Sequence, residues 1–358
     1  MLPYSTLFVP NRLTRCDVPT ILDVAKAAGV STATVSAVVN NSAYVSPKLR
    51  GRVLAAIETL QYAPLSAART LKRGRSQLIA LIVSDLANPF FGRIVWAAEA
   101  AVAAWGYSLL VFNSDEKPEN ERRILSRIRT LSCDGVVLVP VGTSLRHEQR
   151  DFHSNAMPMV LFGRTIADAP CDSVRLDNVS AAWQVTDYLM DLGHRRIGTI
   201  TGPLHISTGR GRLDGMVQAM ATRGLAADPA HIRSGEFRED VAYSVARDLL
   251  DRGDRPTALY VANGVMALGV MRALTDLGLR CPDDISIAST DTIPGVGGLR
   301  PRLTRTEHPA VDMTNEALRL LIERIERGAQ GIPPRHVVFQ PAMVLGDSCK
   351  PALVPAAG

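Results

Sequence analysis

Hydroxyl-bearing side chains gather between Ser31 and Asn40, at a spacing that suits contact with DNA. A helix lying in the major groove presents the side chains of its first turns to base edges. Hydroxyl groups near a helix N-terminus suit phosphate oxygens, so Ser31 and Thr34 are predicted to face phosphates. The other positions predicted to contact DNA, the first four of them at base edges, are Thr32, Ala33, Ser36, Ala37 and Asn40.

No enzymatic motif accompanies these residues. The sequence contains no glycine-rich phosphate loop ending in Lys-Ser/Thr, no G-x-S-x-G and no H-E-x-x-H. The seven histidines do not pair at the spacing of metal ligands, and the five cysteines are scattered without a C-x-x-C pair. We therefore expect no catalysis, no cofactor, no metal site and no disulfide framework.

The segment that would contact DNA is predicted to be the second helix of a helix-turn-helix unit. Thr20 is suited to cap a first helix over residues 21–28, and Gly29 would end that helix in the left-handed conformation. Ser31 would then cap the second helix, over residues 32–40, whose valines face inward. The pattern is that of two helices meeting across a tight turn.

A third helix and a short hinge segment are predicted to follow. Ser46 and Pro47 form a common helix start, and apolar residues recur at helical spacing from Leu49 to Leu60. Residues 66–72 are then helical in character, before a basic linker at 73–76. Because isolated helices this short are marginal, the hinge segment should become ordered only when a partner holds it.

Positive charge is concentrated at the N-terminal end. Residues 1–76 carry ten Lys/Arg against three Asp/Glu, a net charge of +7, within a chain whose total is +5. The rest of the chain is therefore slightly acidic. A basic head on a near-neutral body predicts a polyanion-binding module joined to a separate domain, although a solvated basic surface is the alternative on charge alone.

Composition places the chain among ordinary globular proteins. With 358 residues, 46% hydrophobic and 21% charged, it is long enough for two or three domains and is not typical of long disorder. No apolar run approaches the roughly 20 residues that span a bilayer. The N-terminus lacks the pattern of an export signal. We expect a cytoplasmic protein with no membrane partner.

From Gln77 onward, apolar strands alternate with amphipathic helices. This alternation predicts parallel sheets covered by helices on both faces. One barrel and two doubly wound lobes both fit the spacing, and periodicity alone does not decide between them. The predicted strands are 78–83, 108–112, 135–140, 159–162, 196–201, 258–261 and 285–289.

Several motifs resemble the lactose repressor (LacI) and purine repressor family of bacterial transcriptional regulators. The run PTILDVAKAAGVSTATVSAVVNNSAYVSPKLRGRVLAAIETLQYAPLSAARTL is similar to the DNA-binding head and hinge of that family. Family-like segments of the body include DLANPFF from Asp85, LDN from Leu176, LGHRRIG from Leu192 and GRLDG from Gly211. The resemblance covers residues 19–349.

The resemblance implies an all-α head and hinge joined to an α/β body of two interleaved lobes, like the periplasmic sugar-binding proteins and crossed by the chain three times. It also implies a repressor that binds a near-palindromic double-stranded operator as a homodimer or a tetramer. A solute-binding receptor without a DNA role is the alternative, but it would have no DNA-binding head. The implied divisions are a disordered extension (1–18), the head (19–62), the hinge (63–76), the effector-binding and dimerisation domain (77–349) and a tail (350–358).

In the hinge, the resemblance implies a leucine that wedges into the minor groove. Leu71 holds that position, and Arg69 and Lys72 stand beside it as phosphate partners. Tyr62 would pack beneath the head or meet a phosphate. The family often carries Arg or His where this chain has Ala37, so its direct readout of bases is thinner and the operator sequence is not predictable.

The resemblance also implies a small-molecule effector in a cleft between the lobes, at the carboxyl ends of the strands. Departures from the family pattern at Gly163, Gly264 and Thr292 each remove a carboxylate. Two arginines among fewer acids favour an anionic effector, such as a sugar acid or a phosphorylated sugar. The alternatives are a neutral polyol and a cleft that has lost its effector. The implied effector-binding residues are Asp85, Phe90, Phe91, Arg164, Thr208, Arg212, Asn263 and Asp291.

Overall fold

The described part of the chain, in a computed structural model, comprises residues 19–62, 75–142, 157–167, 169–291, 300–328 and 333–352. The chain divides into two units, residues 1–76 and residues 77–358, and each is described by itself.

The first unit contains the three predicted helices, α1 (Ile21–Ala28), α2 (Thr32–Asn40) and α3 (Pro47–Leu60). The side chain of Thr20 accepts a hydrogen bond from the backbone of Asp23, and the Asp23 carboxylate accepts one from the backbone of Thr20 at 2.9 Å. This reciprocal capping box begins α1. Ser46 is the N-cap residue of α3, but its side chain makes no capping hydrogen bond, and Pro47 is the first residue of the helix.

A small apolar core holds the three helices together. Val24, Val35 and Val53, one from each helix, are fully buried. Gly29 ends α1 with a φ of 62°, and a Cβ atom at this position would collide with the guanidinium group of Arg52. Arg52 donates from Nη2 to a carbonyl oxygen at the end of α1, so the glycine makes room for a cap that α3 supplies.

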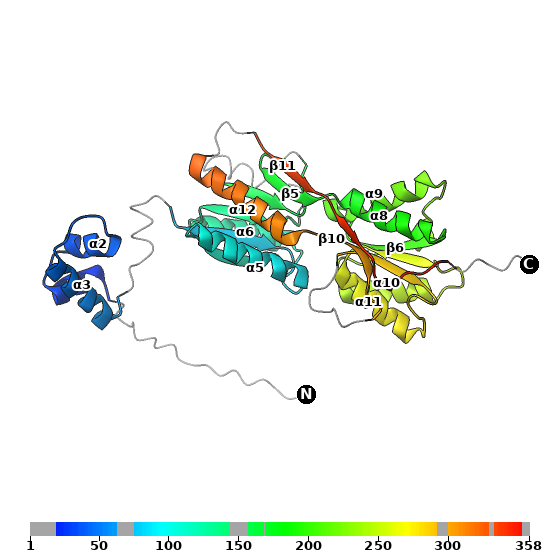
Figure 1. The fold of residues 1–358 in the computed structure, drawn as a ribbon, viewed down its shortest axis with the longest axis horizontal. Helices are drawn as coiled ribbons and strands as arrows, with labels where there is room; N and C mark the ends of the chain where they lie inside the picture. The colour runs from blue at the N-terminus through cyan, green and yellow to red at the C-terminus, as the bar shows by residue number, and fades with distance from the viewer. Residues whose placement is uncertain are drawn as a thin grey trace, which may run out of the picture. The chain divides into compact units, whose positions relative to one another are not determined.

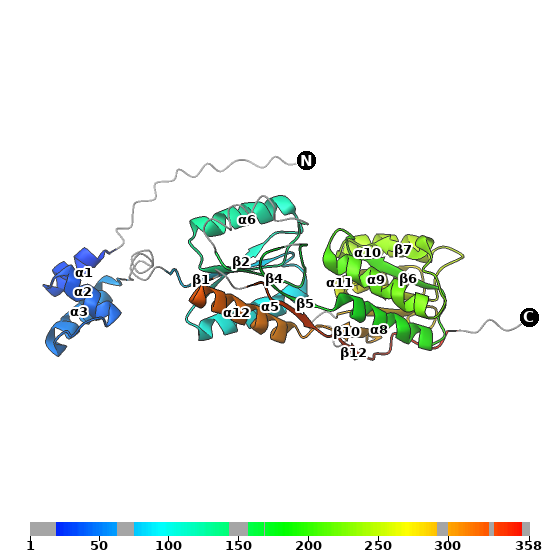
Figure 2. The ribbon, with the colours of Figure 1, turned by 90° about the horizontal axis from the view of Figure 1, so that it is seen from above.

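The second unit has two lobes, each built on a six-stranded sheet (Figure 1). In the first lobe every strand pair is parallel, in the order β11-β5-β4-β3-β1-β2. Helices α5 (Pro89–Ala104) and α12 (Ala310–Arg327) cover one face of this sheet, and α6 (Pro118–Thr130) covers the other (Figure 2). The strands are β1 (Leu78–Val83), β2 (Ser108–Asn113), β3 (Gly135–Leu138), β4 (Met159–Phe162), β5 (Asp172–Leu176) and β11 (His336–Phe339).

The second lobe repeats this plan in the order β12-β10-β9-β8-β6-β7, with only β12 antiparallel to its neighbour. Helices α8 (Asn178–Asp191) and α9 (Ser207–Thr222) cover one face, and α10 (Glu239–Leu250) and α11 (Gly264–Asp276) cover the other. A 3-10 turn, η1 (Pro229–His231), precedes β7. The strands are β6 (Ile197–Thr201), β7 (Ile232–Ser234), β8 (Ala258–Val261), β9 (Ser286–Thr290), β10 (Thr304–Glu307) and β12 (Ala342–Val344).

The chain crosses between the lobes three times, from β5 to α8, from β10 to α12 and from β11 to β12 (Figure 1). Of the two architectures that fit the spacing of the strands, one barrel or two doubly wound lobes, the structure has the two lobes. The crossings place the carboxyl ends of strands from both sheets opposite one another, which is where doubly wound sheets bind ligands.

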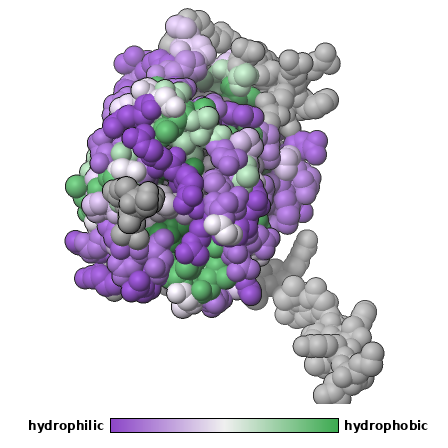
Figure 3. Space-filling model, turned by 90° about the vertical axis from the view of Figure 1, so that its right-hand side faces the viewer, coloured by the Kyte–Doolittle hydropathy of each residue, from purple (hydrophilic) through white to green (hydrophobic). Residues whose placement is uncertain are grey.

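The surface of the second lobe is mainly hydrophilic on the face shown in Figure 3, where hydrophobic residues lie in separate patches. Within the described ranges, no single helix is long and apolar enough to cross a membrane. The pair α1 and α2 meets the length and composition criteria only jointly, and the two helices are bent by 104° relative to each other.

Candidate functional site

The start of α2 presents the side chains predicted to contact DNA. Thr32 and Ala33 are exposed, while Thr34 is half-buried. The hydroxyl of Ser31 accepts a hydrogen bond from the backbone of Thr34 at 3.2 Å and so caps the helix. The helix N-terminus is therefore held in a regular geometry, with a hydroxyl group and a methyl group turned outward from its first turn.

The second turn of α2 is less open. Ser36, Ala37 and Asn40 are half-buried, and Nδ2 of Asn40 donates to the backbone oxygen of Ser36 at 2.9 Å. Tyr62 packs against the apolar core of the head, which is the first of the two positions predicted for it. The hinge residues predicted to contact DNA, Arg69, Leu71 and Lys72, lie outside the described residues.

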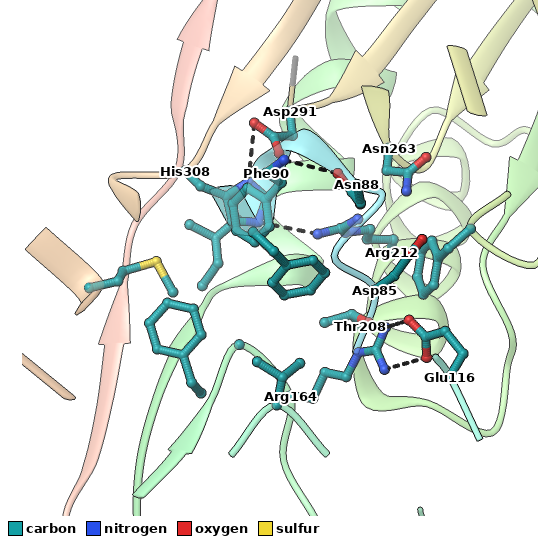
Figure 4. A pocket seen from close by; sticks show the side chains of 17 residues that line it. Asp85, Asn88, Phe90, Glu116, Arg164, Thr208, Arg212, Asn263, Asp291 and His308 are labelled. Carbon is teal, nitrogen blue, oxygen red and sulfur yellow. Dashed lines mark hydrogen bonds and ion pairs between the residues drawn. The ribbon is translucent and has the colours of Figure 1, made fainter. Parts of the chain in front are cut away.

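All eight residues predicted to bind the effector line one cleft between the lobes (Figure 4). The cleft has a volume of about 660 Å³, which includes space open to solvent. Asp85, Phe90 and Phe91 come from the loop after β1 and the start of α5, and Arg164 follows β4. The remaining members come from the second lobe: Thr208, Arg212, Asn263 and Asp291.

Arg164 does not act as a free cation in this cleft. Its Nη1 and Nη2 donate to the two carboxylate oxygens of Glu116 at 2.7 and 2.6 Å, and Nη1 also donates to the backbone oxygen of Pro140. Such a two-pronged pair neutralises the arginine. The pairing weakens the argument for an anionic effector, which counted two arginines among fewer acids, because three carboxylates line the cleft with two guanidinium groups. Glu116 follows a predicted strand, where its carboxylate could have been anticipated.

Arg212 differs from Arg164 in its partners. The guanidinium is buried, donates from Nε to Oδ1 of Asn178 at 2.9 Å and also contacts the backbone oxygen of Ala262. Its third partner is Nε2 of His308, at 3.2 Å from Nη2. All three partners are uncharged, and burial lowers the pKa of Arg212 from its ordinary value. Arg212 forms no ion pair with any described residue, and its three hydrogen bonds leave two of its five N–H donors for a ligand in the cleft that it lines.

His308 is a cleft residue that the sequence did not reveal, because it follows β10, which was not predicted. Since Arg212 can only donate, Nε2 of His308 accepts and the ring hydrogen sits on Nδ1. Burial and the adjacent guanidinium of Arg212 hold the pKa of His308 well below its usual range, so the ring is neutral. Its Nδ1 is buried without a hydrogen-bond partner in the described structure, 3.9 Å from Oδ1 of Asp291.

Two further polar groups of the second lobe are available to a ligand. Oγ1 of Thr208 is buried, with no hydrogen-bond partner in the ranges that the structure describes. Oδ1 of Asn263 accepts from the backbone of Met266 at 2.8 Å and caps α11, which leaves the amide nitrogen for the cleft. A buried polar group without a partner costs stability, so these groups are poised to bond a ligand.

Aromatic rings cover the cleft from both lobes. Phe90 contacts the ring of His308 at a centroid distance of 5.1 Å, and Phe237 lies 5.6 Å beneath the guanidinium of Arg164. Phe237 holds a φ of 56°, unusual for a residue with a bulky side chain, and a Cβ atom on Gly202 would collide with its ring. The sequence carried no signal for Phe237, because its position depends on a three-residue strand and on this distant glycine.

Comparison with known proteins agrees with both parts of the structure. Residues 20–64 match the family model for bacterial regulatory proteins of the lacI family, and residues 186–349 match a periplasmic binding protein-like domain. The chain is similar to the HTH-type transcriptional repressor PurR of Haemophilus influenzae, with 32% identity over 93% of this chain and 99% of the relative. It is also similar to the HTH-type transcriptional repressor CytR of Escherichia coli, with 34% identity over 86% of this chain and 90% of the relative.

Solved structures extend this similarity to the whole fold. The lac repressor dimer bound to operator and the anti-inducer ONPF matches with a TM-score of 0.81 and 26% identity, over 93% of this chain and 99% of that one. The transcriptional regulator CelR in complex with cellobiose matches with a TM-score of 0.70 and 29% identity, over 92% and 99%. With the helix-turn-helix head, the two-lobed body and these relatives, the chain belongs to the LacI family of bacterial transcriptional regulators.

Proposed function

We propose that this protein is a cytoplasmic repressor that binds a near-palindromic operator as a homodimer and is controlled by a neutral sugar in the interlobe cleft. The observation that carries the effector class is the pairing of Arg164 with Glu116, which neutralises that arginine, while the carboxylates of Asp85 and Asp291 line the same cleft as Arg212. Around it lie carboxylates, an amide and aromatic rings.

A sugar fits this arrangement better than a sugar acid does. Vicinal hydroxyls accept hydrogen bonds from Arg212 and His308 and donate to the carboxylates of Asp85 and Asp291. The apolar face of a sugar ring lies well against Phe90 or Phe237. An additional negative charge would instead meet the carboxylates, because Glu116 has already neutralised Arg164. The relative solved with cellobiose supports the same class.

A ligand panel tests the effector class. The full-length protein is titrated by calorimetry and thermal shift with cellobiose, ribose and other neutral sugars, and with matched sugar acids and sugar phosphates. A neutral effector should raise the melting temperature in proportion to the logarithm of its concentration, once that concentration exceeds its Kd. Binding confined to the acids or phosphates would contradict the proposed class.

The proposal that the protein binds DNA is supported by its helix-turn-helix head and by its similarity to known repressors. α2 presents its first turn outward, and the residues predicted to contact DNA lie on it. One such helix offers few base contacts, so two heads acting together on a two-fold site supply the affinity. Selection from a random DNA library should return a near-palindrome, and removal of residues 1–62 should abolish its binding. Recovery of no preferred sequence, together with effector binding, would favour the solute-receptor alternative.

A further inference from the structure

We propose that Arg164 and Thr165 form a clasp with Ser207 and Phe237 that holds the two lobes together, and that Arg164 positions the lobes instead of bonding the effector. This inference rests on the proposed function, in which the cleft binds the effector, and assigns the residues that keep the cleft closed. The guanidinium carbon of Arg164, in the first lobe, lies 5.6 Å from the ring centre of Phe237, in the second. The backbone of Thr165 donates to Oγ of Ser207, the first residue of α9, at 2.9 Å.

The clasp lies at the end of the cleft that is remote from the three crossings. The crossings involve β5 and β11 in the first sheet and β10 and β12 in the second, which are the last two strands at one edge of each sheet. Phe237 follows β7, at the other edge of the second sheet, and Glu116, the partner of Arg164, follows β2, at the other edge of the first. Figure 4 shows Arg164 and Glu116 on the opposite side of the cleft from His308, which lies at a crossing. A contact so far from the hinge resists rotation of the lobes with a long lever arm.

Bonds within the first lobe hold Arg164 in place for this contact. Both terminal nitrogens donate to the carboxylate of Glu116, and Nη1 also donates to the backbone oxygen of Pro140 at 3.2 Å. Three of the five N–H donors of Arg164 therefore have partners in its own lobe. Because a guanidinium group is planar and weakly hydrated, it packs well against an aromatic ring. Arg164 can thus contact Phe237 without giving up its charge partner.

The two loops that meet at Arg164 share an unusual backbone. Glu116 and Phe237 each lie three residues after the end of an edge strand, with φ of 54° and 56°. The residue before each of them is also left-handed, with φ of 55° at Asp115 and 52° at Glu236. Two consecutive residues with side chains persist in this conformation only where the surrounding structure holds them. Both lobes therefore place backbone strain beside Arg164, which is typical of a functional contact.

The clasp would set the affinity of the cleft for its effector. Only the closed form presents groups of both lobes to one ligand, so the apparent Kd is the intrinsic Kd divided by the closed fraction. A variant that reduces the closed fraction to about a tenth should weaken every effector about tenfold, whatever the charge of that effector. Loss of a residue that bonds the ligand would instead discriminate between ligands. This difference separates a positioning residue from a binding residue.

Hydrogen exchange in the full-length protein, without DNA or effector, tests the clasp. Ser207→Ala removes the hydrogen-bond acceptor, and Phe237→Leu removes the aromatic ring. Each should raise exchange about tenfold in cleft-lining peptides of both lobes, because opening at one contact releases the other. Phe237→Tyr keeps the ring and should exchange like the parent. Tyr243→Leu is the matched control, because Tyr243 contacts Arg272 at 4.2 Å within the second lobe alone.

The outcomes separate this inference from the proposed function. Faster exchange on both sides of the cleft, with slow exchange kept in α6 and α11, supports the clasp. Exchange like the parent's, faster exchange in only the substituted lobe, or faster exchange throughout the protein would each overturn it. None of these results bears on the repressor, because neither DNA nor a sugar is present. Failure of the ligand panel or of operator selection would instead count against the proposed function.

Discussion

Arg212 donates a hydrogen bond to Nε2 of His308 over 3.2 Å, and this bond joins the second lobe to the crossing between β10 and α12. The same guanidinium bonds to Asn178, at the crossing between β5 and α8. A single cleft residue thus contacts two of the three connections between the lobes. A ligand on Arg212 would act on the segments about which the lobes turn.

Replacing Arg212 with alanine should abolish the effector response. Effector-linked changes in DNA affinity of about 5- to 150-fold are common, and this change should fall to near one because the group that links the ligand to the crossings is gone. Operator affinity without effector should change little. Fluorescence anisotropy with operator, at increasing effector, measures both. Arg210→Ala, an exposed arginine of the same helix, is the control; a full response in Arg212→Ala would refute the role.

Replacing Leu71 with alanine should weaken specific operator binding, because it would remove the wedge predicted to enter the minor groove. An apolar wedge is part of how hinge segments of this kind hold kinked DNA. Effector affinity of the DNA-free protein should be unchanged, as calorimetry would show. Leu54→Ala removes a leucine that is 52% exposed on α3 and serves as the matched control in the head. If Leu71→Ala binds operator like the parent, the predicted wedge does not exist.

Operator binding should depend steeply on salt. If each dimer neutralises about six to ten phosphates, counterion release gives a log–log slope of about −5 to −9 for the association constant against salt concentration. Titrations between low and moderate salt measure this slope directly. A slope near −1 would show that the basic residues of the head and hinge do not contact phosphates.

Replacing Glu116 with glutamine should shift the ligand preference of the cleft. The side chain of Arg164 is only 7% exposed, so loss of its carboxylate partner leaves a nearly buried cation that favours an anionic ligand. We expect sugar acids to gain affinity relative to neutral sugars and the protein to lose about 1–3 kcal/mol of stability. Competition calorimetry with matched sugar and acid measures the ratio. Glu119→Gln, exposed on α6, is the control, and an unchanged ratio would contradict this view of Arg164.

Low pH should destabilise the second lobe through His194. The residue is 3% exposed, and its ring forms hydrogen bonds with Thr257, Ser286 and the backbone oxygen of Lys350. Burial lowers its pKa from 6.5. Between the lowered pKa and 6.5 only the unfolded chain gains the proton, so stability falls as pH drops through this window. The free energy of unfolding of His194→Gln should therefore fall less than that of the parent between pH 7 and pH 5.5.

Thermal or urea unfolding of the parent and of His194→Gln across that range provides the measurement. His308, whose pKa is also lowered, contributes in the same direction and remains in both proteins, so the difference isolates His194. His205→Gln, at an exposed position, controls for loss of a histidine. Parallel pH curves for the parent and His194→Gln would contradict the prediction.

The elements predicted from the sequence are those in which local pattern and packing agree. The three helices of the head, and strands β1, β4 and β8, have the predicted bounds because their caps or apolar runs are continuous. Strand β5 was missed because Asp172 and Arg175 interrupt its apolar residues. The buried carboxylate of Asp172 is held by Arg324 and Arg335, at 2.6 and 3.2 Å, from the far end of the chain.

The cleft shows the same division. The cleft residues that belong to a family motif are predictable from the sequence. Glu116, Phe237 and His308 are not, because each contacts an arginine that is distant in the sequence. A single sequence indicates that an arginine is present but not which carboxylate neutralises it. The charge of a cleft is a property of such pairs, and for this reason arginine and acid counts alone favour a different effector class from the one that the pairing supports.

The three short connections between the lobes also determine what kind of information a ligand can pass on. A single connection would let the lobes move independently, whereas three connections should suppress sliding and leave a rotation as the main relative movement. Molecules of different chemistry that occupy the cleft therefore compete along one coordinate, the opening angle. A compound that holds the lobes apart and one that draws them together would therefore have opposite effects on the opening angle, even if both contacted the same cleft residues.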